Sequence, residues 1–182
     1  LKELITNVTK NEKIHVYTGA NIESIEGYVG SFRIVFKHNG EQKTVEHGVV
    51  IVAVGAAQYT PTEYMYGVDK RVLTTLEFEG KLMREGTDAK DIVVMQCVGS
   101  RDETWSNCSR VCCSNAIANA LRIKEKYPDT NVYILYKDIR TYGFREDYYT
   151  EAARQGVAFI RYYEDAKPSV SVSGGRLEIR VK

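Results

Sequence analysis

The order of apolar and polar residues divides the chain into two parts with different structural periods. In the first part, an amphipathic stretch favours a helix, and several short stretches alternate apolar and polar residues as half-buried strands do. We predict the helix over residues 1–8 and strands over 14–17, 21–28, 32–36 and 44–46. Asn39-Gly40 lies between the last two strands and favours a tight hairpin turn, because both residues tolerate positive φ. The first part therefore predicts a β-meander.

A continuous apolar run follows the meander, from Gly48 to Gly55. A strand that is covered on both faces shows such a run in place of alternation. We therefore expect residues 48–55 to form a buried strand of a parallel sheet.

The second part alternates strands with helices. We predict strands over 91–96, 131–136 and 157–162, helices over 109–127 and 145–155, and a closing hairpin over 169–172 and 176–181. This order makes a parallel sheet with helical crossovers the default topology. The predicted fold class is α/β, with a Rossmann-like parallel sheet and a β-meander. A segment at 71–90, with a short helix around 74–84 and a polar end, is expected to link a first domain over 1–70 to a second over 91–182.

Charge and hydropathy limit the partners that the sequence supports. The 182 residues include 25 basic and 24 acidic side chains, and the net charge of +1 gives no electrostatic reason to expect nucleic acid or an anionic membrane. No apolar run approaches the roughly 20 residues of a membrane span, and the start lacks the features of a signal peptide. We expect a cytoplasmic protein without membrane insertion. Because a predicted helix opens at Leu1 without an initiator Met, we also expect a fragment of a longer protein.

The only four cysteines, Cys97, Cys108, Cys112 and Cys113, lie close together in the sequence. A disulfide framework would spread them along the chain, so this clustering favours a local metal or redox site in a reducing compartment. Cys97 follows a predicted buried strand, and the other three are expected in the first turns of the next helix. In doubly wound folds this is where ligands bind, because helix N-termini offer unpaired N–H groups and positive partial charge.

Four interpretations of the cysteines remain open from spacing alone. They could pack as small apolar side chains, since free Cys is often buried. They could bind zinc, although neither pair has the usual C-x2-C spacing. Cys108 with Cys112, or Cys112 with Cys113, could form a redox disulfide. An iron–sulfur ligand set is the interpretation that we favour, although the spacing is not one of the common ferredoxin spacings.

The loop after the predicted strand 91–96 lacks the signature of a dinucleotide site. Gly99 is its only glycine, whereas a pyrophosphate loop would carry G-x-G-x-x-G. The loop therefore argues against ordinary NAD binding. Arg101 and Arg110 add positive charge near the cysteines, which suits a group with negative charge.

The sequence resembles the family formed by the A subunits of heterodisulfide reductases, which includes the A subunit of quinone-interacting oxidoreductase complexes. The residues that carry the resemblance are Cys97-Val98-Gly99-Ser100-Arg101-Asp102-Glu103, Cys108-Ser109-Arg110-Val111-Cys112-Cys113, Lys124-Glu125-Lys126-Tyr127-Pro128-Asp129, Asp138-Ile139-Arg140, Val16-Tyr17-Thr18, Glu26-Gly27-Tyr28-Val29-Gly30, Val50-Ile51-Val52-Ala53-Val54-Gly55-Ala56 and Pro61-Thr62-Glu63-Tyr64. They extend over most of the chain, and the cysteine block is the most specific.

The resemblance implies an FAD-containing core like that of thioredoxin reductase within a larger electron-transfer subunit. It makes residues 1–70 the C-terminal part of an FAD-binding-like domain, and 91–182 a nucleotide-binding-like domain that carries the cysteines. It assigns Cys97, Cys108, Cys112 and Cys113 as ligands of a [4Fe-4S] cluster. The family's Ala-Thr-Gly element maps onto Ala53-Val54-Gly55, with Val replacing Thr.

Two loops supply the candidate cofactor-binding residues, which are Gly55, Ala56, Gly99, Ser100 and Arg101. The family's N-terminal G-x-G-x-x-G is missing, so we expect this chain alone not to retain FAD. The sequence supports no assignment of catalytic residues.

The function we expect is that of an oxidoreductase segment, inactive on its own, that passes electrons between flavin and the cluster with other subunits of a complex. The alternative is a non-catalytic Rossmann-like interaction module whose cysteines bind zinc or are structural.

Overall fold

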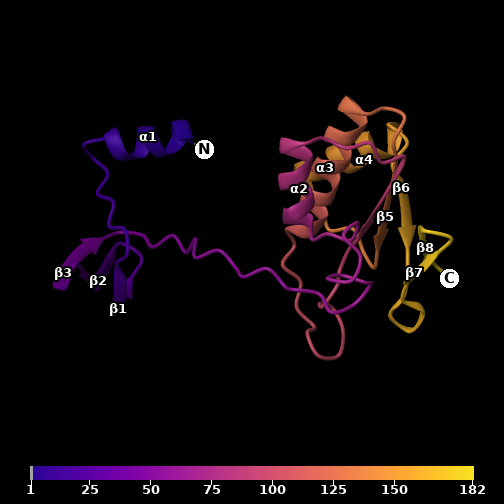
Figure 1. Ribbon diagram of the computed structural model, residues 1–182. Helices are drawn as coiled ribbons and strands as arrows, with labels where there is room; N and C mark the ends of the chain where they lie inside the picture. Colours follow the sequence, from indigo (N-terminus) through magenta and orange to yellow (C-terminus); the bar gives the residue numbers. More distant parts are fainter. Residues whose placement is uncertain (1) are drawn as a thin grey trace. The chain divides into compact units, whose positions relative to one another are not determined.

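The computed structural model describes residues 2–182, which form two compact units, one ending at Ala57 and one running from Gln58 to Lys182 (Figure 1). Each unit is described by itself. This division and the predicted domain bounds of 1–70 and 91–182 differ in detail, and the identity of the units as domains stays a prediction.

The first unit is a three-stranded antiparallel meander preceded by a helix. It contains α1 (Lys2–Lys10), β1 (Asn21–Tyr28), β2 (Ser31–His38) and β3 (Glu41–His47), with β2 in the middle of the sheet. Asn39 and Gly40 form the predicted turn, with φ of 52° and 83°. Both angles are positive, as the primed hairpin turns require. The β-meander is thus confirmed, and so is the first helix from Lys2 onward, whereas Leu1 of the predicted helix lies outside the described residues.

The core of the first unit is small. Phe36 on β2 is its one buried residue among those described, and the ring of Tyr17 packs against it with 4.9 Å between centroids. The strand predicted over 14–17 is wrong, because this stretch forms no ladder. The alternating apolar residues of this stretch, Ile14 and Val16, are 43% and 50% exposed.

The apolar run after β3 does not form the predicted strand. Residues 49–57 are extended without ladder partners, and Ile51 and Val54 are 85% and 88% exposed. A strand needs a neighbour for its backbone N–H and C=O groups. Within the first unit, the last such contact is the 2.7 Å hydrogen bond from Gly30 N–H to Gly48 O. The prediction of a buried parallel strand at 48–55 is therefore wrong for this structure.

The second unit has the predicted α/β order. Its elements are α2 (Thr75–Arg84), β4 (Asp91–Met95), α3 (Cys112–Lys126), β5 (Asn131–Tyr136), the 3₁₀ turn η1 (Gly143–Arg145), α4 (Glu146–Arg154), β6 (Ala158–Arg161), the 3₁₀ turn η2 (Glu164–Ala166), β7 (Ser169–Ser173) and β8 (Arg176–Arg180). Strands β4, β5 and β6 form a parallel sheet in that order, and β7 pairs with β8 in the closing hairpin. The predicted fold class is confirmed.

The core of the second unit lies between its helices and its parallel sheet. Figure 1 shows α2, α3 and α4 gathered on one side of β5 and β6. The cluster joins apolar side chains of all three helices to β5, including Leu82, Ile117, Ile123, Ile134 and Ala152. Within the predicted linker, α2 begins with a capping box in which Thr74 and Glu77 each bond the other's backbone N–H. It packs on α3 rather than standing free.

In the part of the chain that the structure describes, no helix combines the length and the apolar character that crossing a bilayer demands. The cytoplasmic location stays a prediction.

Candidate functional site

The candidate site lies where the three parallel strands end. Cys97 comes two residues after β4, Lys137 and Asp138 follow β5 directly, and Arg161 closes β6. The carboxyl ends of parallel strands meet at one edge of a sheet, which is where open α/β folds bind ligands. Cys97 has a φ of +62°, which is uncommon for a residue with a side chain. The chain therefore turns sharply at this cysteine.

The remaining cysteines lie around the start of α3. Cys112 and Cys113 are the first two residues of the helix, whereas Cys108 precedes it in the loop. The expectation that Cys108 lies in the first turns of this helix is wrong. Arg110, with a φ of +61°, lies between them and reverses the backbone. Helix α3 has no side-chain cap, so its first N–H groups are free to meet an anionic group.

Cys97, Cys108 and Cys112 lie near enough to Cys113 for their charges to act on its thiol. Burial raises the pKa of the Cys113 thiol, and hydrogen bonding to the backbone of Arg140 lowers it in part. The charges of Cys97, Cys112 and Cys108 each raise that pKa further. The structure therefore places three thiols in the neighbourhood of Cys113, and their role as a ligand set stays a prediction. Over residues 2–182, however, no three His, Cys, Asp or Glu side chains are placed so that they could hold a metal ion together.

Three of the sulfurs have hydrogen-bond partners. The backbone N–H of Arg110 donates to Cys108 Sγ at 3.3 Å, and the Ser109 hydroxyl lies 3.1 Å from Cys112 Sγ. The Cys113 thiol donates to the carbonyl oxygen of Asp138 at 3.8 Å. Cys113 is 5% exposed and Cys112 is exposed, so the cysteines extend from the core to the surface.

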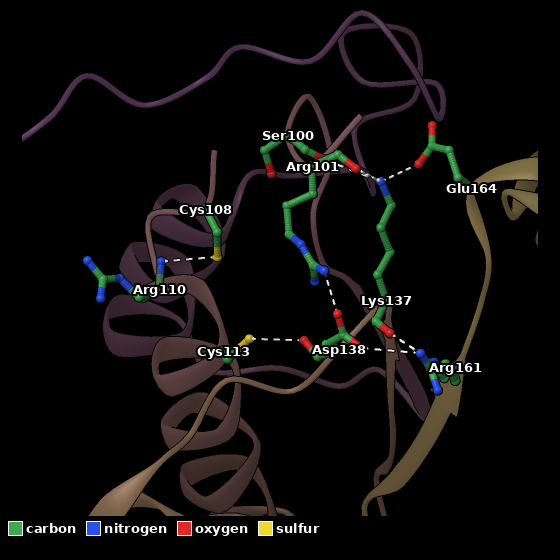
Figure 2. A network of polar contacts seen from close by, with 9 residues as sticks. All are labelled: Ser100, Arg101, Cys108, Arg110, Cys113, Lys137, Asp138, Arg161 and Glu164. Atoms are coloured by element: carbon green, nitrogen blue, oxygen red, sulfur yellow. Dashed lines mark hydrogen bonds and ion pairs between the residues drawn. The ribbon is translucent and has the colours of Figure 1, made fainter. Parts of the chain in front are cut away.

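Asp138 connects the loops of the site (Figure 2). Its carboxylate accepts hydrogen bonds from Arg101 and from Arg161 Nη2, the latter at 3.3 Å. Its backbone carbonyl is the partner of Cys113. The Arg101 guanidinium lowers the pKa of the Asp138 carboxyl, with the charges of Arg161 and Arg140 adding to the effect. Asp138 therefore stays ionised and joins the loop after β4 to the start of α3.

Lys137 holds the same loop through its backbone. Its ammonium donates to the carbonyl oxygens of Arg101 at 2.9 Å and Ser100 at 3.3 Å, and it pairs with Glu164. The Lys137 side chain is only 10% exposed, so these contacts are shielded from water. The loop that begins at Cys97 is thus fixed to β5 on both its main chain and its side chains.

A small cavity of about 60 Å³ opens beside Cys97. Lys137, Tyr162, Tyr64 and Gly99 are among the residues that line it. The Tyr162 hydroxyl donates to the carbonyl oxygen of Gln96 at 2.6 Å, and burial raises the pKa of this phenol. This hydrogen bond anchors the backbone one residue before Cys97.

The predicted cofactor-binding residues fall in both units. Gly99, Ser100 and Arg101 form the loop after Cys97, where Gly99 has a φ of +63°. Gly55 and Ala56 are exposed and belong to the first unit. The structure makes the first three part of the cysteine site and leaves the cofactor role of all five a prediction.

Sequence reasoning missed Lys137, Asp138 and Tyr162 as parts of the site. A signal was present, because Lys137-Asp138 follows the strand at 131–136 as Cys97 follows the strand at 91–95. Residues directly after neighbouring parallel strands share one edge of the sheet. This rule would have placed the pair beside the cysteines.

Comparison with known proteins finds relatives that are named as A subunits of heterodisulfide reductases. The A subunit of the H(2):CoB-CoM heterodisulfide,ferredoxin reductase of Methanothermobacter marburgensis is 40% identical over 146 residues, which is 69% of this chain and 22% of that protein. The iron-sulfur A subunit of the CoB–CoM heterodisulfide reductase of Methanocaldococcus jannaschii is 40% identical over 151 residues, 72% of this chain and 23% of that protein. The A subunit of the ferredoxin:CoB-CoM heterodisulfide reductase of Methanosarcina mazei is 36% identical over 172 residues, 81% of this chain and 22% of that protein.

The chain is homologous to a segment of the A subunits of heterodisulfide reductases. The resemblance drawn from the cysteine block is therefore confirmed. The matched segment spans about 22% of the length of the first of these relatives. No protein-family model matches the chain.

Proposed function

We propose that the protein is part of an oxidoreductase of the heterodisulfide reductase type, in which Cys97, Cys108, Cys112 and Cys113 hold a [4Fe-4S] cluster that exchanges electrons with FAD. The observation that carries the proposal is that Cys97 lies just after β4 and that Cys113, at the start of α3, donates to the carbonyl oxygen of Asp138 just after β5. Cys112 is next to Cys113, and Cys108 lies in the loop before α3. The names of relatives that share 36–40% identity with the chain, one of which is an iron-sulfur subunit, support the same class of reaction.

The residues present fit such a cluster in chemistry and charge. Four thiolates are the usual ligand set for [4Fe-4S] clusters. The negative charge of the ligands and sulfides suits the uncapped N-terminus of α3 and the cations Arg101 and Arg110. Arg101 Nη1 is buried without a hydrogen-bond partner among the described residues, so an N–H donor remains available beside Cys97. A group rich in sulfur acceptors would satisfy this donor.

The chain's own residues would bind and orient the cluster. Bound there, the cluster supplies one-electron transfer. The thiolates would hold the iron, and the N–H of Arg110 and hydroxyl of Ser109 would stay hydrogen-bonded to the sulfurs of Cys108 and Cys112. Cys113 and the chain around it exclude water from the inner side of the site, while the exposed Cys112 leaves an outer side through which electrons can pass.

We propose that Gly55 and Ala56 of the first unit contact the flavin, and Gly99, Ser100 and Arg101 remain candidate cofactor-binding residues of the second unit. This assignment rests on the family resemblance. The chemistry that follows is electron exchange with other subunits of a complex, because each of the named relatives is itself one subunit of an enzyme.

Electron transfer to the loaded site tests the proposal. The purified protein would be loaded with iron and sulfide under anaerobic conditions and mixed with photoreduced FAD in a stopped-flow spectrometer. We expect the broad visible absorbance of the cluster to bleach as the flavin is reoxidised, and to be missing from Cys112→Ser. A loaded cluster that reduced flavin never bleaches would overturn the proposed function. A protein that holds only zinc would instead support an interaction module with a structural site.

A further inference from the structure

We propose that Arg101 donates its free Nη1 N–H to a sulfur of the group that the cysteines hold, and that Asp138 positions it to do so. Arg101 would then raise the reduction potential of the site, and Asp138 would be the positioning residue. This inference rests on the proposed function and goes beyond it, because no relative's name assigns a role to either residue.

The Arg101 side chain has one N–H donor, at Nη1, without an acceptor. Its Nη2 donates to the carboxylate of Asp138, whereas its Nη1 is buried and has no hydrogen-bond partner over residues 2–182. The side chain is 17% exposed, so water does not easily take the place of a partner. A buried donor without an acceptor is destabilising, because it has lost its hydrogen bonds to water without replacing them. Such a cost is usually offset where a ligand completes the hydrogen bond.

The Arg101 guanidinium lies near Cys97. The Cys97 sulfur is close enough to Arg101 to interact with it through both charge and hydrogen bonding. The hydrogen bond to Asp138 fixes one edge of the guanidinium, because its donors are arranged in a rigid plane. The hydrogen bond to Asp138 thereby fixes where the free edge of the guanidinium lies.

Asp138 contacts both the loop after β4 and the start of α3. Asp138 binds Arg101 through its carboxylate and Cys113 through its carbonyl oxygen (Figure 2). Arg161 Nη2 donates to the same carboxylate at 3.3 Å, and Arg161 Nε donates to the Lys137 carbonyl oxygen at 3.0 Å. The guanidinium of Arg101 is thus held relative to Cys113 at the start of α3.

The backbone of Arg101 is fixed as well. Its φ of +58° is rare for a residue with a long side chain, and its carbonyl oxygen accepts a hydrogen bond from Lys137. A residue held in such a conformation is over-determined by its surroundings. The fixed backbone therefore restricts the direction of the Arg101 side chain, which contacts Asp138.

A redox consequence follows from the charge. Reduction adds one negative charge to an iron–sulfur cluster, and a cation that donates an N–H to its sulfur stabilises the reduced form more than the oxidised form. Hydrogen bonds to the sulfurs and net charge are two of the factors that set the potential of such clusters. Arg101 is expected to raise the potential.

The experiment compares Arg101→Gln and Arg101→Lys with Arg122→Gln. Arg122 is a matched control, because it also pairs with a carboxylate, Glu79 at 2.8 Å, but lies on α3 with 53% of its side chain exposed. Each protein would be loaded with iron and sulfide and titrated under anaerobic conditions, with the reduced cluster followed by electron paramagnetic resonance. We expect Arg101→Gln to shift the midpoint potential to more negative values and to change the g-values. Arg101→Lys should give a smaller negative shift, and Arg122→Gln should give none.

The outcomes separate this inference from the proposed function. Failure of the unchanged protein to assemble a cluster would overturn the proposed function. A cluster in the unchanged protein whose potential and g-values are the same in both Arg101 variants would overturn the role of Arg101 alone. Loss of the cluster in Arg101→Gln, with a native far-ultraviolet circular dichroism spectrum and a loaded Arg122→Gln, would support positioning. If Arg101→Gln does not fold, the midpoint potential of Arg101→Lys tests the role of Arg101. A shift to more negative values would support it, and an unchanged potential would overturn it.

Discussion

The aromatic ring of Tyr59 lies directly against the backbone of Gly99. A Cβ atom on Gly99 would come within 2.3 Å of the Tyr59 ring, far inside van der Waals contact. Gly99 also has a φ of +63°, in the left-handed region that favours glycine. The absence of a side chain at residue 99 is therefore required twice, by the backbone and by the ring above it.

Substituting Gly99 by Ala should destabilise the second unit. The left-handed backbone alone costs about 1–2 kcal/mol with a side chain, and displacing the ring should add about 1–3 kcal/mol as overpacking does. Urea unfolding followed by circular dichroism would measure the loss.

Gly143→Ala is the matched control for this loss. Gly143 has a φ of +66°, but a Cβ there would meet nothing within 4 Å. It should show only the backbone cost, and Tyr59→Ala should recover part of the extra loss in Gly99→Ala. Equal destabilisation at both glycines would contradict the close contact with Tyr59.

Replacing Lys137 by Met should loosen the loop that carries Cys97. Lys137 is nearly buried and donates to the carbonyl oxygens of Ser100 and Arg101. Removing hydrogen bonds from a charged donor in a shielded place should cost about 1.5–3 kcal/mol in the free energy of unfolding. We also expect the loaded protein to lose iron faster to a chelator, which absorbance would follow.

Lys167→Met serves as the control because Lys167 also pairs with Glu164 but is 45% exposed. An exposed pair contributes about 0–1 kcal/mol. If both lysine variants lose iron at the same rate, the carbonyl contacts of Lys137 have no role in holding the site.

The stability of the second unit should depend on pH in the acid range because of Asp69. Hydrogen bonds from the Arg71 side chain and then from its backbone lower the pKa of Asp69 from 3.8 to about 2. Because the folded-state pKa is lowered, the stabilisation is present above about pH 3.8 and is lost as the pH falls through about 2. Arg71 Nη1 also donates to Gly175 O at 2.8 Å, so this contact ties the β7–β8 hairpin to the loop before α2.

Asp69→Asn should therefore be less stable than the unchanged protein at neutral pH, and the difference should shrink between pH 4 and pH 2. Urea unfolding at several pH values would measure it, and Arg71→Gln should show the same trend. A difference that stays constant down to pH 2 would mean that the Asp69 carboxylate does not contribute.

Sequence reasoning predicted the second unit better than the first. The strand at 131–136 matches β5 residue for residue, because a short apolar strand between a helix and turn residues has few alternatives. The prediction of a buried strand from Gly48 to Gly55 was wrong, since apolar residues signal burial but do not supply the neighbouring strand. The sequence cannot show whether that neighbour is present within the same unit.

The candidate site was predicted as a set of residues but not as a geometry. Clustering in the sequence was enough to bring the cysteines together, because one loop and one helix start carry them all. The positive φ at Cys97, Arg101 and Arg110 shifts the start of α3 to Cys112, and no period in the sequence reports it. Lys137 and Asp138 were missed because ion pairs between distant loops leave no local pattern.

The central claim is that the four cysteines hold one iron–sulfur cluster. Its most direct test is the iron, zinc and acid-labile sulfide content of the anaerobically reconstituted protein, measured beside Cys112→Ser. Since Cys112 is exposed, its substitution should change the stability of the apoprotein by less than about 0.5 kcal/mol. We predict a brown protein with iron and sulfide in equal amounts and a variant that retains neither. A colourless protein with stoichiometric zinc, or a Cys112→Ser variant that keeps all its iron, would contradict the account.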